Sequence, residues 1–396
     1  KGGGASRPPF SSVPDGNFLT ASMPGCYVAH TSSSWAIQAD RFDREEFGLS
    51  PSDHVPDVSI DPEEGILTVI NATSDKTRAY YVSIEGDDVA AYDRQGRRLQ
   101  PGVTRDSLGQ PVGCLTLVMT LPPMRMLDVC RLELPPEGPS GVKLSSDISD
   151  LEAGPHGQGG GSHGTHGTCD PPPLVVGFPL GGKGPYLCSQ GRGGEFTHFY
   201  SATRHAIDLE CPVGTPVLSI APGEVVDVKD SNVAGGIHVS LLYAWNSISV
   251  EQKDKKVVDY VHIRQGSARV KIGDIINAGD WLCDSGDVGF CPRPHLHLQI
   301  TASPAKDAPT VPFSFRCSPP PPAASKPPLS FVPFAGLWYN KDGEFKLNAH
   351  RSDGTFPAQA GSWASVLAVH EQLAGKIGHV AREVVCGYLL GWPWCR

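Results

Sequence analysis

Two histidines stand two residues apart in the stretch RPHLHLQI, at His295 and His297. Polar and apolar residues alternate along this stretch, which predicts a β-strand with one buried face. Residues two apart in a strand point to the same side, so the imidazoles would share one face while Leu296 and Leu298 pack on the other. A His-x-His pair alone is more often structural than functional. Its meaning therefore depends on the residues around it.

Two further residues of the same segment could act with this pair. Asp208 lies in the apolar run Ala206–Leu209, where a buried carboxylate is costly unless it is paired or bound to a metal. His262 lies in the β-like run YVHI. Three histidines and one aspartate on expected strands are the side chains from which zinc sites are built.

Four blocks of sequence add a resemblance to this pattern: SQGRGGEFTHF, HAIDLECPVGTPV, YVHI and PHLHLQI. In their order and spacing the chain resembles the lysostaphin-like zinc metallopeptidases over roughly residues 175–302. The resemblance implies a mostly antiparallel β core, a Zn²⁺ cofactor, and hydrolysis of peptide bonds, typically in the cross-links of bacterial peptidoglycan. No helical His-Glu-x-x-His motif accompanies the site residues, so the mechanism of the helical zinc peptidases does not apply.

The resemblance gives each candidate residue a role. It implies that Asp208 and His297 are zinc ligands. It also implies that His262 and His295 flank the attacking water, one taking its proton and the other donating a hydrogen bond to the developing oxyanion.

The remaining zinc ligand has two candidates. The simplest family pattern has a histidine four residues before the aspartate, where this chain has Arg204. His198 matches a variant pattern in which the ligand arrives on a longer loop, and it is the favoured ligand. His205 is the alternative, although an offset of three in an extended strand would point it away from Asp208.

The composition of the rest of the chain predicts separate domains joined by linkers. Strand-like runs such as GILTVINAT and AYYVSIEG predict a small antiparallel, Ig-like sandwich. Gly/His-rich and Pro-rich stretches predict linkers, and apolar residues at helical spacing predict an amphipathic helix near the C-terminus. We expect a mainly β protein with an irregular N-terminal arm (1–55), a β-sandwich domain (56–150), a Gly/His/Pro linker (151–174), a lysostaphin-like peptidase domain (175–316), a Pro-rich linker (317–333) and a C-terminal region with a helix (334–396).

The chain has 11 cysteines and no Cys-x-x-Cys pair. Scattered cysteines at this density favour disulfides, and hence a secreted protein or an oxidising secretory compartment. Three pairs could bridge: Cys114 with Cys130, Cys188 with Cys211, and Cys283 with Cys291.

The overall charge and hydrophobicity of the chain indicate which kinds of binding partner are favoured or disfavoured. Hydrophobic residues make up 39% of the chain and charged residues 19%, which fits a globular protein. The net charge of −9 disfavours nucleic acid as a partner, and it also provides no long-range attraction to an anionic cell wall. No apolar run is long enough for a transmembrane segment.

Two functions follow from these observations. The first is a zinc-dependent endopeptidase that acts on peptidoglycan peptides or other glycine-containing peptides. The second is a catalytically silent peptidase fold that serves a structural or binding role, with the flanking regions contacting partners in a larger assembly. Stoichiometric zinc without cleavage would favour the second.

Overall fold

The computed structural model describes residues 19–23, 25–29, 39–50, 52–86, 90–151, 172–194, 196–317 and 330–344. Within these ranges it contains 28 strands, mostly in antiparallel pairs, and two short 3-10 helices, η1 (Gly138–Gly141) and η2 (Val239–Leu241). The prediction of a mainly β, antiparallel fold is confirmed. No helix of the described ranges is long and apolar enough to cross a membrane. The expected C-terminal helix and most of both linkers lie outside the described residues.

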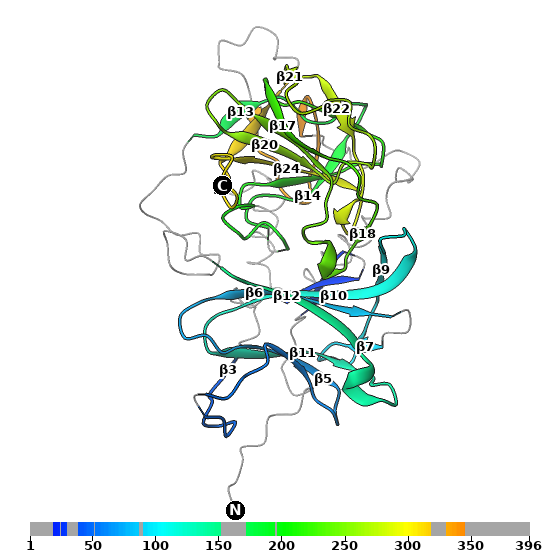
Figure 1. Ribbon diagram of the computed structural model, residues 1–396, viewed down its shortest axis with the longest axis vertical. Coiled ribbons are helices and arrows are strands. Elements are labelled where there is room, and N and C mark those ends of the chain that lie inside the picture. The colour runs from blue at the N-terminus through cyan, green and yellow to red at the C-terminus, as the bar shows by residue number, and fades with distance from the viewer. Residues whose placement is uncertain are drawn as a thin grey trace, which may run out of the picture.

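Residues 19–151 supply two sheets that pack face to face, here called the N-terminal sheet pair (Figure 1). The first sheet runs β1 (Leu19–Met23), β2 (Cys26–Ala29), β10 (Pro111–Leu121) and β9 (Gly102–Arg105), with β6 (Arg78–Glu85) on β10 and β12 (Lys143–Asp150) on β6. The second runs β4 (Val58–Ile60), β5 (Ile66–Asn71), β11 (Arg125–Leu132), β7 (Ala91–Tyr92) and β8 (Arg98–Leu99), with β3 (Asp40–Arg41) on β11.

Strand β6 is buried on both faces. Tyr80, Val82 and Ile84 point into the core between the two sheets. Ala79 and Tyr81 point the other way, into a second cluster shared with the later part of the chain. This double burial explains why β6 does not alternate between apolar and polar residues but has the consecutive apolar residues Ala79–Val82.

The segment that resembles a peptidase forms a nine-stranded sheet, which we call the peptidase sheet. Its order is β21 (Ile275–Ile276), β17 (Gly223–Lys229), β19 (Ser247–Glu251), β20 (Val257–Val261), β24 (His295–Thr301), β15 (Ile207–Glu210), β14 (Tyr186–Gln190), β27 (Trp338–Asn340) and β28 (Gly343–Glu344). Two small sheets pack beside it: β13 (Leu174–Val176) with β25 (Phe313–Arg316) and β26 (Ser330–Phe331), and β16 (Pro216–Leu218) with β22 (Trp281–Asp284).

Two short strands join the two parts of the molecule. β18 (Gly235–Gly236) pairs with β9 of the N-terminal sheet pair and also with β23 (Gly289–Phe290). The first sheet therefore continues into the peptidase part of the chain. Figure 1 shows β18 at this junction, between the blue and cyan strands below and the green and yellow strands above.

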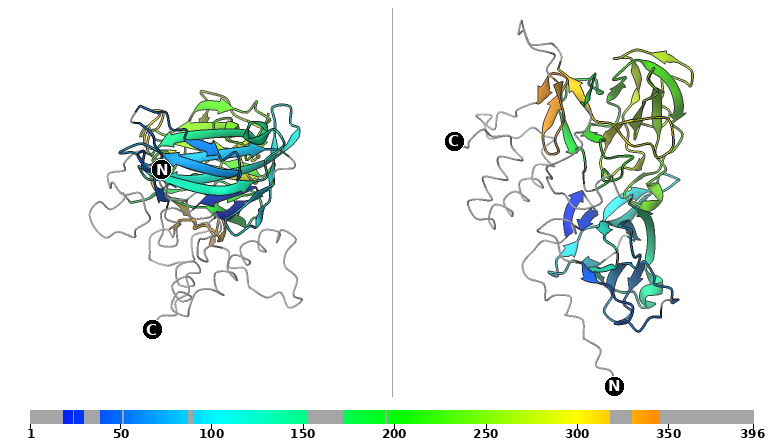
Figure 2. Two further views of the ribbon diagram at one scale, coloured as in Figure 1. Left: turned by 90° about the horizontal axis from the view of Figure 1, so that it is seen from below. Right: turned by 90° about the vertical axis from the view of Figure 1, so that its left-hand side faces the viewer.

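Two of the expected boundaries differ from the structure. The expected irregular arm over residues 1–55 supplies β1, β2 and β3, and β2 is buried beside β10. An apolar run of four residues is too short to show a period, so its strand could not be recognised. Residues 330–344 form β26, β27 and β28, which pair with β25 and β14 instead of belonging to a separate region; these strands are orange in Figure 2.

All eight cysteines of the described ranges are free thiols, so the three expected disulfides are wrong. Cys114 of β10 points into the cluster shared with the later part of the chain, whereas Cys130 of β11 lies in the core between the sheets. The two side chains therefore face different cores. Burial raises the pKa of the Cys130 thiol to about 12 and keeps it protonated.

The other two expected pairs also fail on geometry. Cys188 lies opposite Leu209 in the ladder, which places Cys211 two residues further along the neighbouring strand, too far to bridge. Cys283 packs inside the core of the peptidase part, whereas Cys291 lies beside a histidine at the junction.

The junction predicts a strict requirement for glycine at position 236. Gly236 has φ +136°, and a Cβ there would lie 2.5 Å from the Thr104 Cα. We expect Gly236→Ala to lower the free energy of unfolding by roughly 3 kcal/mol, since both a strained dihedral and a backbone clash result. Gly273→Ala is the control, because Gly273 has φ +91° with nothing within 4 Å, and it should cost only about 1 kcal/mol. Urea denaturation of both variants measures the difference, and equal losses would contradict the close approach.

Candidate active site

Two neighbouring strands hold Asp208 and His297 directly opposite each other. β15 pairs with β24 in the register that places these two residues side by side. The expected alternation of β24 is present, since Leu296 and Leu298 are fully buried in the core beneath the sheet. His295 shares the face of His297, with its Nε2 atom 3.7 Å from Asp208 Oδ1.

The loop after β14 brings His198 to the same carboxylate. His198 Nε2 lies 3.3 Å from Asp208 Oδ1 and 3.3 Å from His297 Nδ1. His297 Nδ1 in turn lies 2.8 Å from Asp208 Oδ1. One atom from each of the three side chains thus converges on a common point, and His198 and Asp208 are almost completely buried there.

The outer nitrogen of each of these imidazoles is held by an acceptor. His198 Nδ1 lies 2.9 Å from the Gly191 carbonyl, which can only accept. His297 Nε2 lies 3.2 Å from Gln299 Oε1, and the Gln299 amide nitrogen donates to Asp259. Both outer nitrogens therefore carry a proton, and the inner nitrogens are the atoms that face Asp208. Burial disfavours charge on His297, but the hydrogen bond to Asp208 raises the pKa of this imidazole, so either a proton or a metal ion can lie between them.

Three acceptor atoms that face one another need a cation or an additional proton between them. Two imidazole nitrogens and one carboxylate oxygen are the ligands of a catalytic zinc site with an open position. The outer hydrogen bonds match the partners that hold metal-ligating histidines in one tautomer. The residues present therefore fit Zn²⁺.

The charge of Asp208 is also supported from the protein side. Burial alone would raise the pKa of the carboxyl, but the imidazoles around it, above all that of His198, hold the pKa well below its usual range when they direct protons toward it. Gln190 donates to Asp208 Oδ2 at 2.8 Å, and its amide oxygen accepts from the backbone N–H of Thr197 at 2.9 Å. Gln190 thus ties the carboxylate to the loop that carries His198.

His262 and His295 lie together beside this group. Their ring centroids are 4.6 Å apart. His262 Nδ1 lies 2.7 Å from the Val288 carbonyl, and His295 Nδ1 lies 2.7 Å from the Arg293 carbonyl. Each Nδ1 therefore donates, which leaves Nε2 as an acceptor. Burial and the neighbouring histidines keep the pKa of His262 well below its ordinary value, so this ring is neutral.

The backbone at His262 is unusual. The residue directly follows β20 and has φ +63°, in the left-handed region that non-glycine residues rarely adopt. Such strain persists where the surroundings fix the residue, and it is concentrated at functional sites. Here the Val288 carbonyl is one of the groups that fix it.

The structure gathers all the preferred site residues in one place. His198, Asp208 and His297 form the converging group, with His262 and His295 next to it. Arg204, at the position of the simplest family pattern, is exposed. His205 is buried outside the group, and its backbone N–H donates to Thr310. The roles of the five residues remain predictions.

Three contributors to the site were missed from the sequence. Gln299 could have been found, because it follows His297 by two residues in the same alternating strand. Gln190 and Cys291 gave no such signal. Cys291 Sγ lies 3.3 Å from His295 Nδ1, and with His262 and His295 it forms a second group of side chains close enough to hold a metal.

Comparison with known proteins identifies this segment. Residues 202–309 match Peptidase family M23, so the chain contains an M23 peptidase domain. The chain is 32% identical over 95 residues to lysostaphin of Staphylococcus staphylolyticus, which covers 24% of this chain and 18% of that protein. It is also 30% identical over 118 residues to the glycyl-glycine endopeptidase ALE-1 of Staphylococcus capitis. This match covers 30% of this chain and 27% of ALE-1.

Further matches extend the same relationship. An uncharacterised metalloprotease of Buchnera aphidicola is 31% identical over 100 residues, covering 25% of this chain and 23% of that protein. The solved catalytic domain of lysostaphin from Staphylococcus simulans is 27% identical, with a TM-score of 0.23 over 34% of this chain and 85% of that chain. The chain spans about a quarter or less of the length of these curated relatives.

The two candidates for the remaining ligand can be separated by metal content. We expect the native protein to bind about one Zn²⁺ per chain. His198→Ala should lose tight zinc binding, because this substitution removes one of the three converging ligand atoms. His205→Ala should keep the metal, since its imidazole lies outside the group. Zinc is measured by atomic emission after dialysis, and loss only in His205→Ala would reverse the assignment.

A second prediction concerns the support of Asp208. Gln190→Leu keeps much of the side-chain volume but leaves Asp208 Oδ2 without this donor and frees the His198 loop. We expect zinc affinity to fall about 10- to 100-fold, as for other partners that orient ligands. Competition with a chelator measures it. Ser249→Ala, which removes a hydrogen bond to Asp259 further out, is the control and should change affinity less.

Proposed function

We propose that this protein is a zinc-dependent endopeptidase that hydrolyses peptide bonds in peptidoglycan cross-links or in other glycine-containing peptides. One observation carries the proposal: two imidazole nitrogens and a carboxylate oxygen converge, and two further histidines, of which His262 is kept neutral by burial, stand beside them. The M23 domain supports peptidase chemistry at this position.

His198, Asp208 and His297 would hold the metal. When bound in such a site, Zn²⁺ acidifies a water molecule toward neutral pH and polarises the scissile carbonyl. The chain itself supplies the rigid ligand set. Gln190, Gln299 and the Gly191 carbonyl orient the three ligands before any metal enters, so little reorganisation is needed.

His262 and His295 would move protons. Each ring has its Nδ1 proton committed to a backbone carbonyl, so Nε2 is the atom available for exchange. One Nε2 would accept the proton of the attacking water. The other ring would take up a proton at Nε2 from solvent before the reaction and donate it in a hydrogen bond to the oxygen that becomes negative. Because each Nδ1 is held by a carbonyl, each ring exchanges protons at Nε2.

The substrate part of the proposal is drawn from relatives. ALE-1 is named as a glycyl-glycine endopeptidase, and it shares 30% of its residues with this chain over the matched region. A glycine-containing peptide is therefore the first substrate to test. The net charge of −9 means that any attraction to an anionic wall must come from local features rather than from the whole chain.

The expected secretion loses its main support. It rested on disulfides, and the eight cysteines of the described ranges do not form any. An extracytoplasmic location is proposed only because peptidoglycan lies there.

Two variants separate metal binding from proton transfer. His262→Ala and His297→Ala both remove an imidazole of the same site, but only His297 is expected to be a ligand. We expect His262→Ala to retain zinc and lose cleavage of a pentaglycine peptide at least about 100-fold, since general acid–base catalysis contributes that much. His297→Ala should lose both zinc and cleavage.

Cleavage is followed by mass spectrometry of pentaglycine and of peptidoglycan stem peptides. Full zinc in the native protein without cleavage of any of these would favour a silent, structural peptidase fold. Cleavage that survives in His262→Ala and in His295→Ala would overturn the proposed proton transfer.

A further inference from the structure

One short segment, Asp287–Cys291, contacts both histidines that are proposed to transfer protons. The Val288 carbonyl accepts from His262 Nδ1. The Cys291 thiol contacts His295 Nδ1 at the other end of the segment. β23 lies between these two contacts. The position of this segment therefore sets the direction in which the His262 imidazole faces, and its Cys291 end packs against His295, whose Nδ1 donates to the Arg293 carbonyl.

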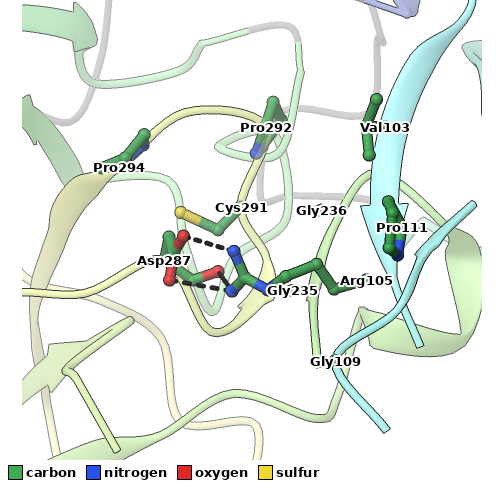
Figure 3. Close-up of a pocket in the computed structure, with 10 residues that line it drawn as sticks. All are labelled: Val103, Arg105, Gly109, Pro111, Gly235, Gly236, Asp287, Cys291, Pro292 and Pro294. Carbon is green, nitrogen blue, oxygen red and sulfur yellow. Dashed lines mark hydrogen bonds and ion pairs between the residues drawn. The ribbon is translucent and has the colours of Figure 1, made fainter. Parts of the chain in front are cut away.

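The N-terminal sheet pair holds the start of this segment. Arg105, at the end of β9, donates to both carboxylate oxygens of Asp287, at 2.6 and 2.9 Å. Figure 3 shows the guanidinium and the carboxylate facing each other edge to edge, with Cys291 directly beside them. The pair lines a cavity of about 320 Å³ between β9 and the segment. A bidentate pair fixes both distance and orientation.

Backbone pairing brings the pair together. Gly235 of β18 stands opposite Arg105 on one side and Gly289 on the other. A Cβ at Gly235 would lie 2.1 Å from the Asp287 carbonyl oxygen and 2.8 Å from Arg105 Nη2. Only glycine allows this approach, so the junction is built for contact between β9 and the segment.

The N-terminal sheet pair, which carries Arg105, is also held against the peptidase part of the chain by other contacts. Tyr81 of β6 donates from its hydroxyl to the Phe196 carbonyl at 2.9 Å. Its ring packs edge-on against Phe290, with centroids 5.9 Å apart, and Phe290 stacks on Phe196 at 5.4 Å. Phe196 lies two residues before His198, so the sheet pair also contacts the loop that carries this residue.

We propose that Arg105 is a positioning residue for the catalytic site, acting through Asp287 on the segment that orients His262 and contacts His295. The inference rests on the proposed function and adds to it a catalytic dependence on the N-terminal sheet pair. Both side chains of the ion pair are about one-third exposed, so its contribution to global stability is small and its effect is on geometry.

The test compares Arg105→Ala with Arg78→Ala. Arg78 is the matched control, because it also lies in the first sheet and pairs with two aspartates, Asp57 and Asp150, but does not contact the segment. We expect Arg105→Ala to lower kcat about 10- to 100-fold with KM and zinc content nearly unchanged, since small misplacement of reacting groups has effects of this size. Arg78→Ala should match the native protein.

Two additional variants test whether Arg105 acts through its contact with Asp287. Charge exchange, Arg105→Asp together with Asp287→Arg, should recover part of kcat. Gly235→Ala, which separates the same groups without changing charge, should lower kcat as Arg105→Ala does. Native kcat in Arg105→Ala, or an equal loss in Arg78→Ala, would overturn the proposal.

A spectroscopic readout works without turnover. In protein with ¹⁵N-labelled histidine, the native His262 ring should show a single tautomer with the proton on Nδ1. Arg105→Ala should show a mixture of tautomers, and Arg78→Ala should not. An unchanged His262 signal in Arg105→Ala would overturn the inference, whereas a native protein that binds zinc but cleaves nothing would overturn only the proposed function.

Discussion

The buried carboxylate of Asp208 is the constraint around which this site is organised. It lies in the middle of the peptidase sheet, where an unpaired negative charge would be strongly unfavourable. Gln190 satisfies one oxygen, and the other faces the inner nitrogens of His198 and His297. Because the outer nitrogens of both rings are already committed to acceptors, only a cation or a proton completes the arrangement.

The strand pairing makes this convergence possible. β24 lies between β15 and β20, so one strand brings its histidines next to Asp208 on one side and next to the end of β20, with His262, on the other. The leucines of β24 anchor the opposite face in the core. The site is thus assembled largely from main-chain register, and the loops add His198, His262 just after β20, and the carbonyls that orient the rings.

The division of the site between strand register and loop contacts explains which of its features could be predicted from the sequence. The alternation in PHLHLQI identifies the face of His295 and His297, and the apolar surroundings of Asp208 mark it as a buried charge. Local patterns do not show which distant backbone carbonyl meets an imidazole, so the roles of Val288 and Gly191 became visible only in three dimensions. The cysteines were misread for the same reason, since spacing along the chain does not reveal that Cys114 and Cys130 face different cores.

Zinc-edge anomalous diffraction from crystals of the intact protein grown with Zn²⁺ would test the account most directly. The account predicts one strong peak within about 2.0–2.2 Å of His198 Nε2, Asp208 Oδ1 and His297 Nδ1, the distances usual for zinc ligands. A crystal with no peak at that point, or with its zinc held instead by His262, Cys291 and His295, would contradict it.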